Sequence, residues 1–543
     1  MKVQYFKNGN FYSMTEREDS FKYLIAIDGK IVFTSDEPIP IGRFQKKADT
    51  KVYDLEGKTI IPSFCDSHVH FLYGALHIDD IHLEDCRSFK SVLDRIEAFY
   101  NTLREKKKED WIIGGGWDKN NWTDKNTDPS YKDLENFTAI PIVLFSKDFH
   151  TVWLNLVAMR LLGTMEPDSK ILYSLGITRE QYIADTDRFE DGKQCGIFRE
   201  NAMKYISTIL SSKRSFSEVD MIDNIKRTSR IFNSSGITAI TDCSSAYCES
   251  PFRFLQKISG DNFTLRCMIS IQEDALDQFI NLGLFSGLGS DMLKIGGLKI
   301  LYDGSLGSQS ALMFLPYKGT SNPGKANYEA QHLSHLIDNA ITHNIGLTVH
   351  AIGDRANFDV ATIFEYSRNR DPRIPLRLEH AQTLTDETIN KLKYLRVHTV
   401  MQPVHIDQDI ATANRFLPDR INLMYRFRTL IDSGMHIAFS TDYPVAPLNP
   451  FYGIYSAVTH SGFNLQKGVP LNKRESISLY EALKSYTYYS HLYSSFPDSG
   501  LLSEGYNADM VVLDKNPFYV KNPDDLLTIK PIGLFFKGEK IMI

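Results

Sequence analysis

Two histidines near the start of the chain, His68 and His70, have the residue type and spacing of a metal-binding pair. In a β-strand, side chains two residues apart point to the same face, so both imidazoles can reach one cation. The pair is weak evidence alone, because about 0.4 His-x-His triplets are expected by chance in a chain with 15 His among 543 residues.

Three further polar residues close other predicted strands. His350 ends GLTVHAIGD, His380 ends PLRLEHAQ, and Asp442 lies in IAFSTDYP. Such groups are costly to bury without partners, and binding to a metal centre would explain why all five residues lie at strand ends. Neutral imidazoles and a carboxylate favour Zn²⁺, with Mn²⁺, Fe²⁺ or Co²⁺ as alternatives.

These residues need a fold that brings strand ends together. Short apolar strands alternate with longer amphipathic segments, which predicts βα units around a parallel sheet. A closed (β/α)8 TIM barrel requires eight strands and carries its chemistry at their carboxyl ends. The sequence offers eight candidates, at 59–71, 236–244, 264–270, 296–304, 346–354, 375–382, 397–406 and 435–445.

The rest of the chain predicts two additions to this α/β barrel of residues 61–496. The first and second strands are too far apart for a plain loop, so we expect an inserted α/β subdomain over about 85–230, over the barrel mouth. Short strand-like segments near both termini predict one small β-sandwich domain from 1–60 and 497–543, with two independent hairpins as the alternative.

Composition limits the function classes. Hydrophobic residues make up 42% and charged residues 24%, as in soluble globular proteins. A net charge of -6 without a basic patch argues against nucleic acid and anionic membranes as partners. The amino terminus does not read as a secretory signal, no apolar run reaches about 18 residues, and six cysteines form no CxxC pair, so we expect a cytoplasmic protein with reduced thiols.

Motifs along nearly the whole chain resemble the amidohydrolase superfamily, and within it amidohydrolase family 3, which includes the YtcJ-like proteins and N-substituted formamide deformylase. The matching segments, in the order of that family, are IPSFCDSHVHF (61–71), GGGWDKNNW (114–122), SKDFHTVWLN (146–155), LKILYDGSLGSQSA (298–311), VHAIGDRAN (349–357), RLEHAQ (377–382), FSTDYPV (439–445) and GYNADMVVLD (505–514).

The resemblance implies a centre with two divalent metals, and the ligand types favour Zn²⁺. His68 and His70 match the ligands of the more buried metal, His350 and His380 those of the second, and Asp442 the last-strand aspartate. Lys299 matches a lysine that can be N6-carboxylated and so bridge both metals.

The residues around Lys299 support that assignment modestly. A lysine inside the apolar run GGLKIL is desolvated, which favours the neutral amine that reacts with CO₂. A snorkelling or salt-bridged lysine is the alternative, and Lys294, five residues upstream, is a competing candidate.

The reaction implied is hydrolysis of an amide-type C–N bond other than a peptide bond, in an N-acyl or N-formyl compound. A metal-activated hydroxide would attack, and Asp442 would act as general base and acid. A mononuclear site, hydrolysis of a C–O ester or lactone, isomerisation, and a non-catalytic regulatory scaffold remain alternatives.

Secondary candidates for contact with a small-molecule substrate lie on predicted loops at the catalytic face and on the insertion. They are His150, Trp153, Asp354, Arg355, Gln402 and His405. Their structural alternatives are an ion pair for Asp354 and Arg355 and a single helix face for His150 and Trp153. A homodimer is the default oligomeric state.

Overall fold

The computed structural model describes residues 1–541 except 17–18, 41, 43–48, 106–110, 120–121, 126, 138, 148–150, 214–216, 245–250, 259, 261–262, 366–370 and 372. The chain divides into two compact units. The first comprises Met1–Ala75 and Ile222–Ile543, and the second comprises Leu76–Met221. Each is described by itself below.

The first unit contains a nearly closed barrel of eight parallel strands, which confirms the predicted barrel. In ring order the strands are β8 (Phe64–Val69), β15 (Ile237–Asp242), β16 (Arg266–Ile271), β17 (Leu293–Leu301), β18 (Leu347–Ala351), β19 (Leu376–His380), β20 (His398–Met401) and β21 (Ile437–Phe439). The two ends of the ring meet where the Asp442 N–H donates to the His68 carbonyl at 3.0 Å.

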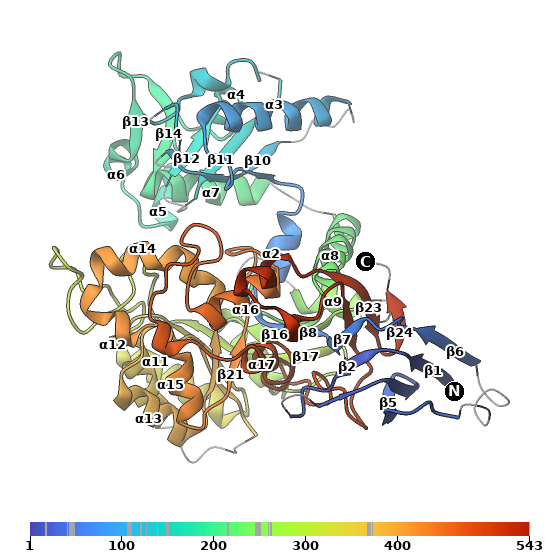
Figure 1. The fold of residues 1–543 in the computed structure, drawn as a ribbon. Helices are drawn as coiled ribbons and strands as arrows, with labels where there is room; N and C mark the ends of the chain where they lie inside the picture. The colour runs from blue at the N-terminus through green and yellow to red at the C-terminus, as the bar shows by residue number, and fades with distance from the viewer. Residues whose placement is uncertain are drawn as a thin grey trace. The chain divides into compact units, whose positions relative to one another are not determined.

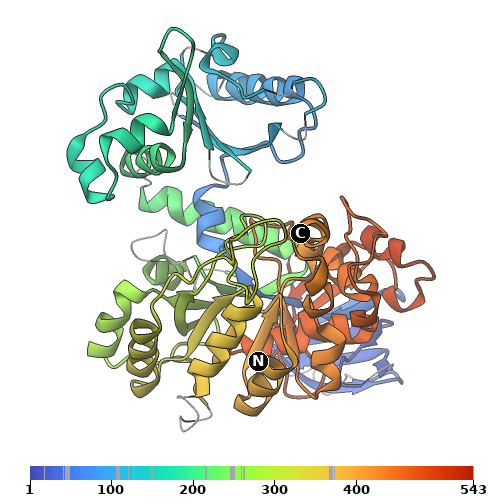
Figure 2. The same ribbon diagram turned by 90° about the vertical axis from the view of Figure 1, so that its left-hand side faces the viewer.

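Helices lie outside the strands, as the amphipathic segments between them predict (Figures 1 and 2). They include α9 (Pro251–Ile258), α10 (Leu276–Asn281), α11 (Ala330–Thr342), α12 (Asp354–Phe364), α13 (Asp386–Leu395), α14 (Ile406–Phe416), α15 (Phe427–Asp432) and α16 (Pro450–Thr459). Every predicted strand segment overlaps one barrel strand.

The first predicted strand, 59–71, is wrong as a single element. It divides at Ser63 into β7 (Thr59–Pro62) and β8, which belong to different sheets. The Ser63 N–H donates to the Asp509 carbonyl at 3.0 Å, whereas the Phe64 N–H donates to the Gly236 carbonyl at 2.9 Å. The apolar pattern runs on through this point although the hydrogen-bond partners change.

Strands from both termini share a sheet in the first unit. A six-stranded sheet has the order β24 (Glu539–Ile541), β23 (Pro531–Phe536), β22 (Met510–Leu513), β7, β2 (Asn10–Tyr12), β3 (Ser20–Phe21). A four-stranded sheet has the order β5 (Lys30–Ser35), β4 (Tyr23–Ile27), β1 (Lys2–Lys7), β6 (Asp49–Asp54). A buried ion pair between Arg266, at the start of β16, and Asp509 ties the barrel to the six-stranded sheet.

The second unit is an α/β domain around its own sheet. The strand order is β13 (Thr186–Arg188), β14 (Gln194–Arg199), β12 (Thr151–Leu154), β11 (Ile142–Ser146), β10 (Ile112–Trp117), β9 (Ile81–His82). Alternate residues of its strands enter two separate cores: Leu144 and Trp153 pack with α3 (Phe89–Glu105), and Val143 and Val152 pack with α4 (Leu156–Leu161) and α7 (Glu200–Lys213). Both faces of this sheet are therefore covered.

The unit is bounded by Leu76 and Met221, whereas the sequence predicts an insertion over 85–230. The second unit ends before most of α8 (Glu218–Ser234), because this helix packs in the first unit. The Phe232 ring of α8 lies 5.3 Å from Phe71 and 5.2 Å from Tyr443. Among the residues that the structure describes, no helix has the length and apolar character needed to cross a membrane.

Candidate metal centre

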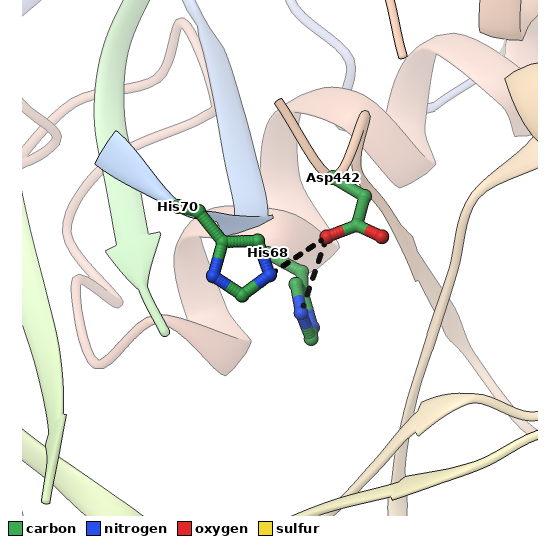
Figure 3. Close-up of side chains that lie close together, drawn as sticks. All are labelled: His68, His70 and Asp442. Carbon is green, nitrogen blue, oxygen red and sulfur yellow. Dashed lines mark ion pairs between the residues drawn. The ribbon is translucent and has the colours of Figure 1, made fainter. Parts of the chain in front are cut away.

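His68, His70 and Asp442 converge at the carboxyl ends of β8 and β21 (Figure 3). Asp442 Oδ1 lies 3.2 Å from His70 Nε2 and 3.6 Å from His68 Nε2. His68 and Asp442 are buried, and His70 is partly exposed. Strand alternation aims both histidines inward, as the spacing of the pair predicts.

A second group shares the same aspartate. His380, His405 and Asp442 also bring ligand atoms within 4.8 Å of one another. His405 Nε2 lies 3.9 Å from Asp442 Oδ2, and the His380 ring lies 5.0 Å from the His68 ring. His405 comes from the 3₁₀ turn Pro403–His405 after β20, which the sequence assigns only to the pocket wall.

Glu379 contacts the candidate ligand His68, and the sequence did not single it out. The His68 Nδ1–H donates to Glu379 Oε2 at 2.6 Å, and the buried Arg377 Nε–H donates to Glu379 Oε1 at 2.8 Å. Burial raises the pKa of Glu379, but the charges of Arg377 and His68 outweigh it and hold the pKa at about 2. Because this carboxylate engages Nδ1, Nε2 is the His68 nitrogen that could bind a metal.

A left-handed backbone explains why consecutive residues Glu379 and His380 both approach His68. The φ angle of His380 is +70°, and that of Asp442 is +62°. This conformation is uncommon for residues other than glycine and ends the regular alternation of the strand. The only sequence signal for Glu379 is a pair of charges, Arg377 and Glu379, inside an otherwise apolar strand.

Lys299 and His350 both lie beside these groups. Lys299, on β17, is buried and places Nζ 3.3 Å from His68 Nε2. The His350 ring lies 4.3 Å from the His380 ring, and the His350 Nε2–H donates to the Gly304 carbonyl at 3.2 Å. Four of the six predicted metal ligands therefore lie in the two groups of three, namely His68, His70, His380 and Asp442. The other two, Lys299 and His350, lie beside these groups.

Burial sets the charge states of the centre. It lowers the pKa of His350 to about 3, with help from the Lys299 charge, and holds the pKa of His380 well below its usual value. Burial raises the pKa of Asp442, but the neighbouring His70 and the charge of His68 bring that pKa well below the usual range. Near neutral pH these shifts leave His350 and His380 unprotonated and Asp442 ionised.

Four side-chain atoms of the candidate ligands are buried without a hydrogen-bond partner in the described part of the chain. They are His70 Nδ1, His380 Nδ1, His405 Nε2 and Asp442 Oδ1. Orphaned buried polar atoms are rare in proteins, and four of them in one cluster of imidazoles and a carboxylate fit a bound cation. Nitrogen and oxygen donors of this kind suit Zn²⁺ and neighbouring divalent metals.

The remaining predicted contact residues have other partners. The Arg355 Nε–H donates to the Asp359 carboxylate at 3.1 Å, and Asp354 Oδ1 accepts the Phe314 N–H at 2.9 Å. Gln402 is buried, and its Nε2–H donates to Ser440 Oγ at 2.9 Å. Trp153 is buried in the core of the second unit. His150 lies outside the described residues.

Three buried carboxylates accept backbone N–H groups beside candidate ligands, and the sequence did not predict these contacts. Asp66 accepts the Thr441 N–H at 2.9 Å, next to Asp442. Asp242 accepts the Phe71 N–H at 3.1 Å, next to His70. Asp303 accepts the Ile352 N–H at 3.0 Å, two residues after His350.

Comparisons with known proteins cover nearly the whole chain. A sequence profile of the amidohydrolase family matches residues 51–532. YtcJ of Bacillus subtilis (strain 168) is 27% identical over 531 residues, 94% of each chain. N-substituted formamide deformylase of Arthrobacter pascens is 22% identical over 537 residues, 94% of this chain and 93% of that protein. The crystal structure of an uncharacterized metal-dependent hydrolase from Pyrococcus horikoshii OT3 superposes with a TM-score of 0.77 at 25% identity, covering 96% of this chain and 99% of that one.

Proposed function

Because the chain belongs to the amidohydrolase family, we propose that it is a metal-dependent hydrolase that cleaves an amide-type C–N bond in an N-acyl or N-formyl compound. The observation that carries the proposal is the carboxylate of Asp442, which is common to two histidine groups. The metal-dependent hydrolase of P. horikoshii supports the metal, and the deformylase of A. pascens supports the amide-type bond.

We assign two divalent metals, Zn²⁺ by preference, to these residues. His68, His70 and Asp442 would hold one ion, and His380, His405 and Asp442 the other. His350 joins the second set because its ring lies against His380. Lys299, with Nζ 3.3 Å from His68 Nε2, is the candidate for N6-carboxylation, and carbon-13 NMR of protein supplied with labelled bicarbonate tests this.

Different side chains have different roles in the proposed hydrolysis. A bound divalent metal lowers the pKa of water and polarises a carbonyl oxygen. Asp442, ionised at neutral pH, accepts the proton of the attacking water at its carboxylate and delivers it to the leaving nitrogen. Glu379 holds the His68 ring in place through both steps, since its 2.6 Å hydrogen bond fixes the tautomer.

Metal analysis of purified protein and its variants tests the two-ion assignment. We expect two ions per chain in the wild type and a loss of metal in His70→Asn and in His405→Asn. His332→Asn is the matched control, because the His332 side chain is 57% exposed on α11. One ion per chain in the wild type would favour the mononuclear alternative.

Activity screens test the bond that is cleaved. N-formyl and N-acyl amines should be hydrolysed by the metal-loaded protein, and Asp442→Asn should lower the rate by at least about 10²-fold. Hydrolysis of the matched esters alone would favour a C–O hydrolase. Full activity in Asp442→Asn and His68→Asn would contradict the proposal.

A further inference from the structure

Leu301 is the last residue of β17 and is 49% exposed, whereas the strand before it is largely buried. The backbone here is fixed. The Asn327 Nδ2–H donates to the Leu301 carbonyl at 3.0 Å, and the Tyr302 N–H donates to the His350 carbonyl at 3.1 Å. The exposure therefore belongs to the side chain and does not come from fraying of the strand.

Two independent features place this side chain on the same face as the metal centre. Leu301 follows Lys299 by two residues, and Lys299 points inward to His68. Leu301 is also the register partner of His350 on the parallel strand β18, and paired residues of neighbouring strands share a face. The His350 ring lies 4.3 Å from the His380 ring, so Leu301 stands beside the candidate ligands at the mouth of the barrel.

An exposed leucine at this place has no part in holding a metal. The nearest residues that share its face on β17 and β18 are Lys299, Thr348 and His350, all of them polar. Ligand sites combine a few such polar groups with apolar walls, and the apolar wall gains free energy when a hydrocarbon group displaces water from it. The occupant best matched to Leu301 is therefore an apolar part of the substrate, next to the bond that reacts.

We propose that Leu301 forms the hydrocarbon-binding wall of the active site, so that the substrate carries an alkyl or aryl group beside its scissile amide. This inference rests on the proposed function. It names the class of substrate, an apolar N-acyl or N-formyl amine, rather than a charged or strongly hydrated one.

A series of n-alkyl hydroxamates, from acetohydroxamate to hexanohydroxamate, tests the wall without any turnover, because the hydroxamate head binds the metal. Calorimetry on the zinc-loaded protein should give an affinity that rises by about fourfold per methylene. Leu301→Asn should flatten this increase, and Leu301→Met should retain it. Leu282→Asn is the matched control, since Leu282 is an exposed leucine (73%) at the end of α10.

The outcomes separate the inference from the function on which it rests. Tight binding of acetohydroxamate without any gain along the series overturns the hydrocarbon wall and leaves the metal centre standing. An equal gain in Leu301→Asn and wild type, with both proteins folded by circular dichroism, also overturns it. Failure of acetohydroxamate to bind overturns the metal centre and the wall together. Hydrolysis of N-formyl alkylamines should follow the same order of chain length in kcat/KM.

Discussion

His68 lies where the carboxylates and the cationic groups of the centre meet. Its Nδ1 lies 2.6 Å from Glu379 Oε2, and its Nε2 lies 3.6 Å from Asp442 Oδ1. Lys299 Nζ lies 3.3 Å from the same Nε2. Burial lowers the pKa of His68, but Cys243 and Glu379 outweigh it and raise that pKa to about 10, so a metal ion bound at Nε2 would take the place of a proton.

Replacing Glu379 by glutamine tests this charge balance at a single residue. Glu379→Gln keeps the shape but removes the charge that fixes His68 and compensates Arg377. We expect Zn²⁺ affinity to fall by about 10–100-fold, as measured by competition with a chromophoric chelator. Glu365→Gln is the control, because Glu365 forms a more exposed ion pair with Lys391. Equal affinity in the two variants would show that Glu379 has no influence on the metal.

Sequence position alone singles out His68, His70, His380 and Asp442, because each follows an apolar strand. Glu379 could not be predicted in this way, since its approach to His68 depends on the left-handed backbone of the next residue. His405 was predicted only as a pocket residue. It lies beyond the strand end, in a turn whose direction the linear pattern does not reveal.

At the scale of the elements, neighbouring strand ends are joined by buried carboxylates rather than by strand hydrogen bonds alone. Asp303, after β17, is the best connected of these. It accepts the N–H groups of Ile352, Gly353 and Leu312 at 2.9–3.0 Å. A Cβ on Gly353 would lie 1.9 Å from the Leu312 carbonyl oxygen, so the two backbones approach too closely for any other residue.

Asp303→Asn tests this connection. An amide has one acceptor oxygen, and its NH₂ group would oppose a backbone N–H that now has a partner. We expect the free energy of unfolding to fall by about 3 kcal/mol in urea titrations. Asp514→Asn is the matched control, because Asp514 accepts the Lys530 N–H at 2.8 Å on the surface. A similar small loss in both variants would mean that the buried contacts of Asp303 add nothing.

Periodicity was enough to predict the barrel strands, but it could not predict their partners. Apolar residues continue on both sides of Ser63 within 59–71, and only the hydrogen bonds of Ser63 and Phe64 divide the segment between two sheets. The second unit ends at Met221, before the predicted 230, for a similar reason. The sequence of α8 shows that the helix has an apolar face, but it does not show which unit that face packs against.

At the scale of the whole molecule, the first unit is held together by contacts between distant parts of the chain. Residues 59–62 pair with 510–513, and Arg266 pairs with Asp509 beneath the barrel. The sequence suggested that the termini meet, because both ends have short strand-like segments. It could not show that they share one sheet, since strand pairing depends on register and not on composition.

His491 gives this unit a pH-dependent stability. It is buried in α18 (Ser490–Tyr493), and its Nδ1–H donates to the Thr487 carbonyl at 2.8 Å. Its Nε2 is buried and has no hydrogen-bond partner among the described residues. A proton there would create a buried charge without an acceptor, and burial accordingly lowers the pKa of His491 to about 4.

The consequence is a loss of stability in mild acid. Below the unfolded pKa of about 6.5, the unfolded chain binds a proton that the folded protein rejects, so the free energy of unfolding falls as the pH drops toward 4. The contribution of this one group is roughly 3 kcal/mol across that window. In urea titrations between pH 7 and pH 4, the free energy of unfolding should therefore fall less in His491→Gln than in the wild type. His332→Gln is the control, because His332 lies on the exposed face of α11, and its free energy of unfolding should follow that of the wild type. Parallel pH profiles for His491→Gln and the wild type would assign the acid sensitivity to other groups.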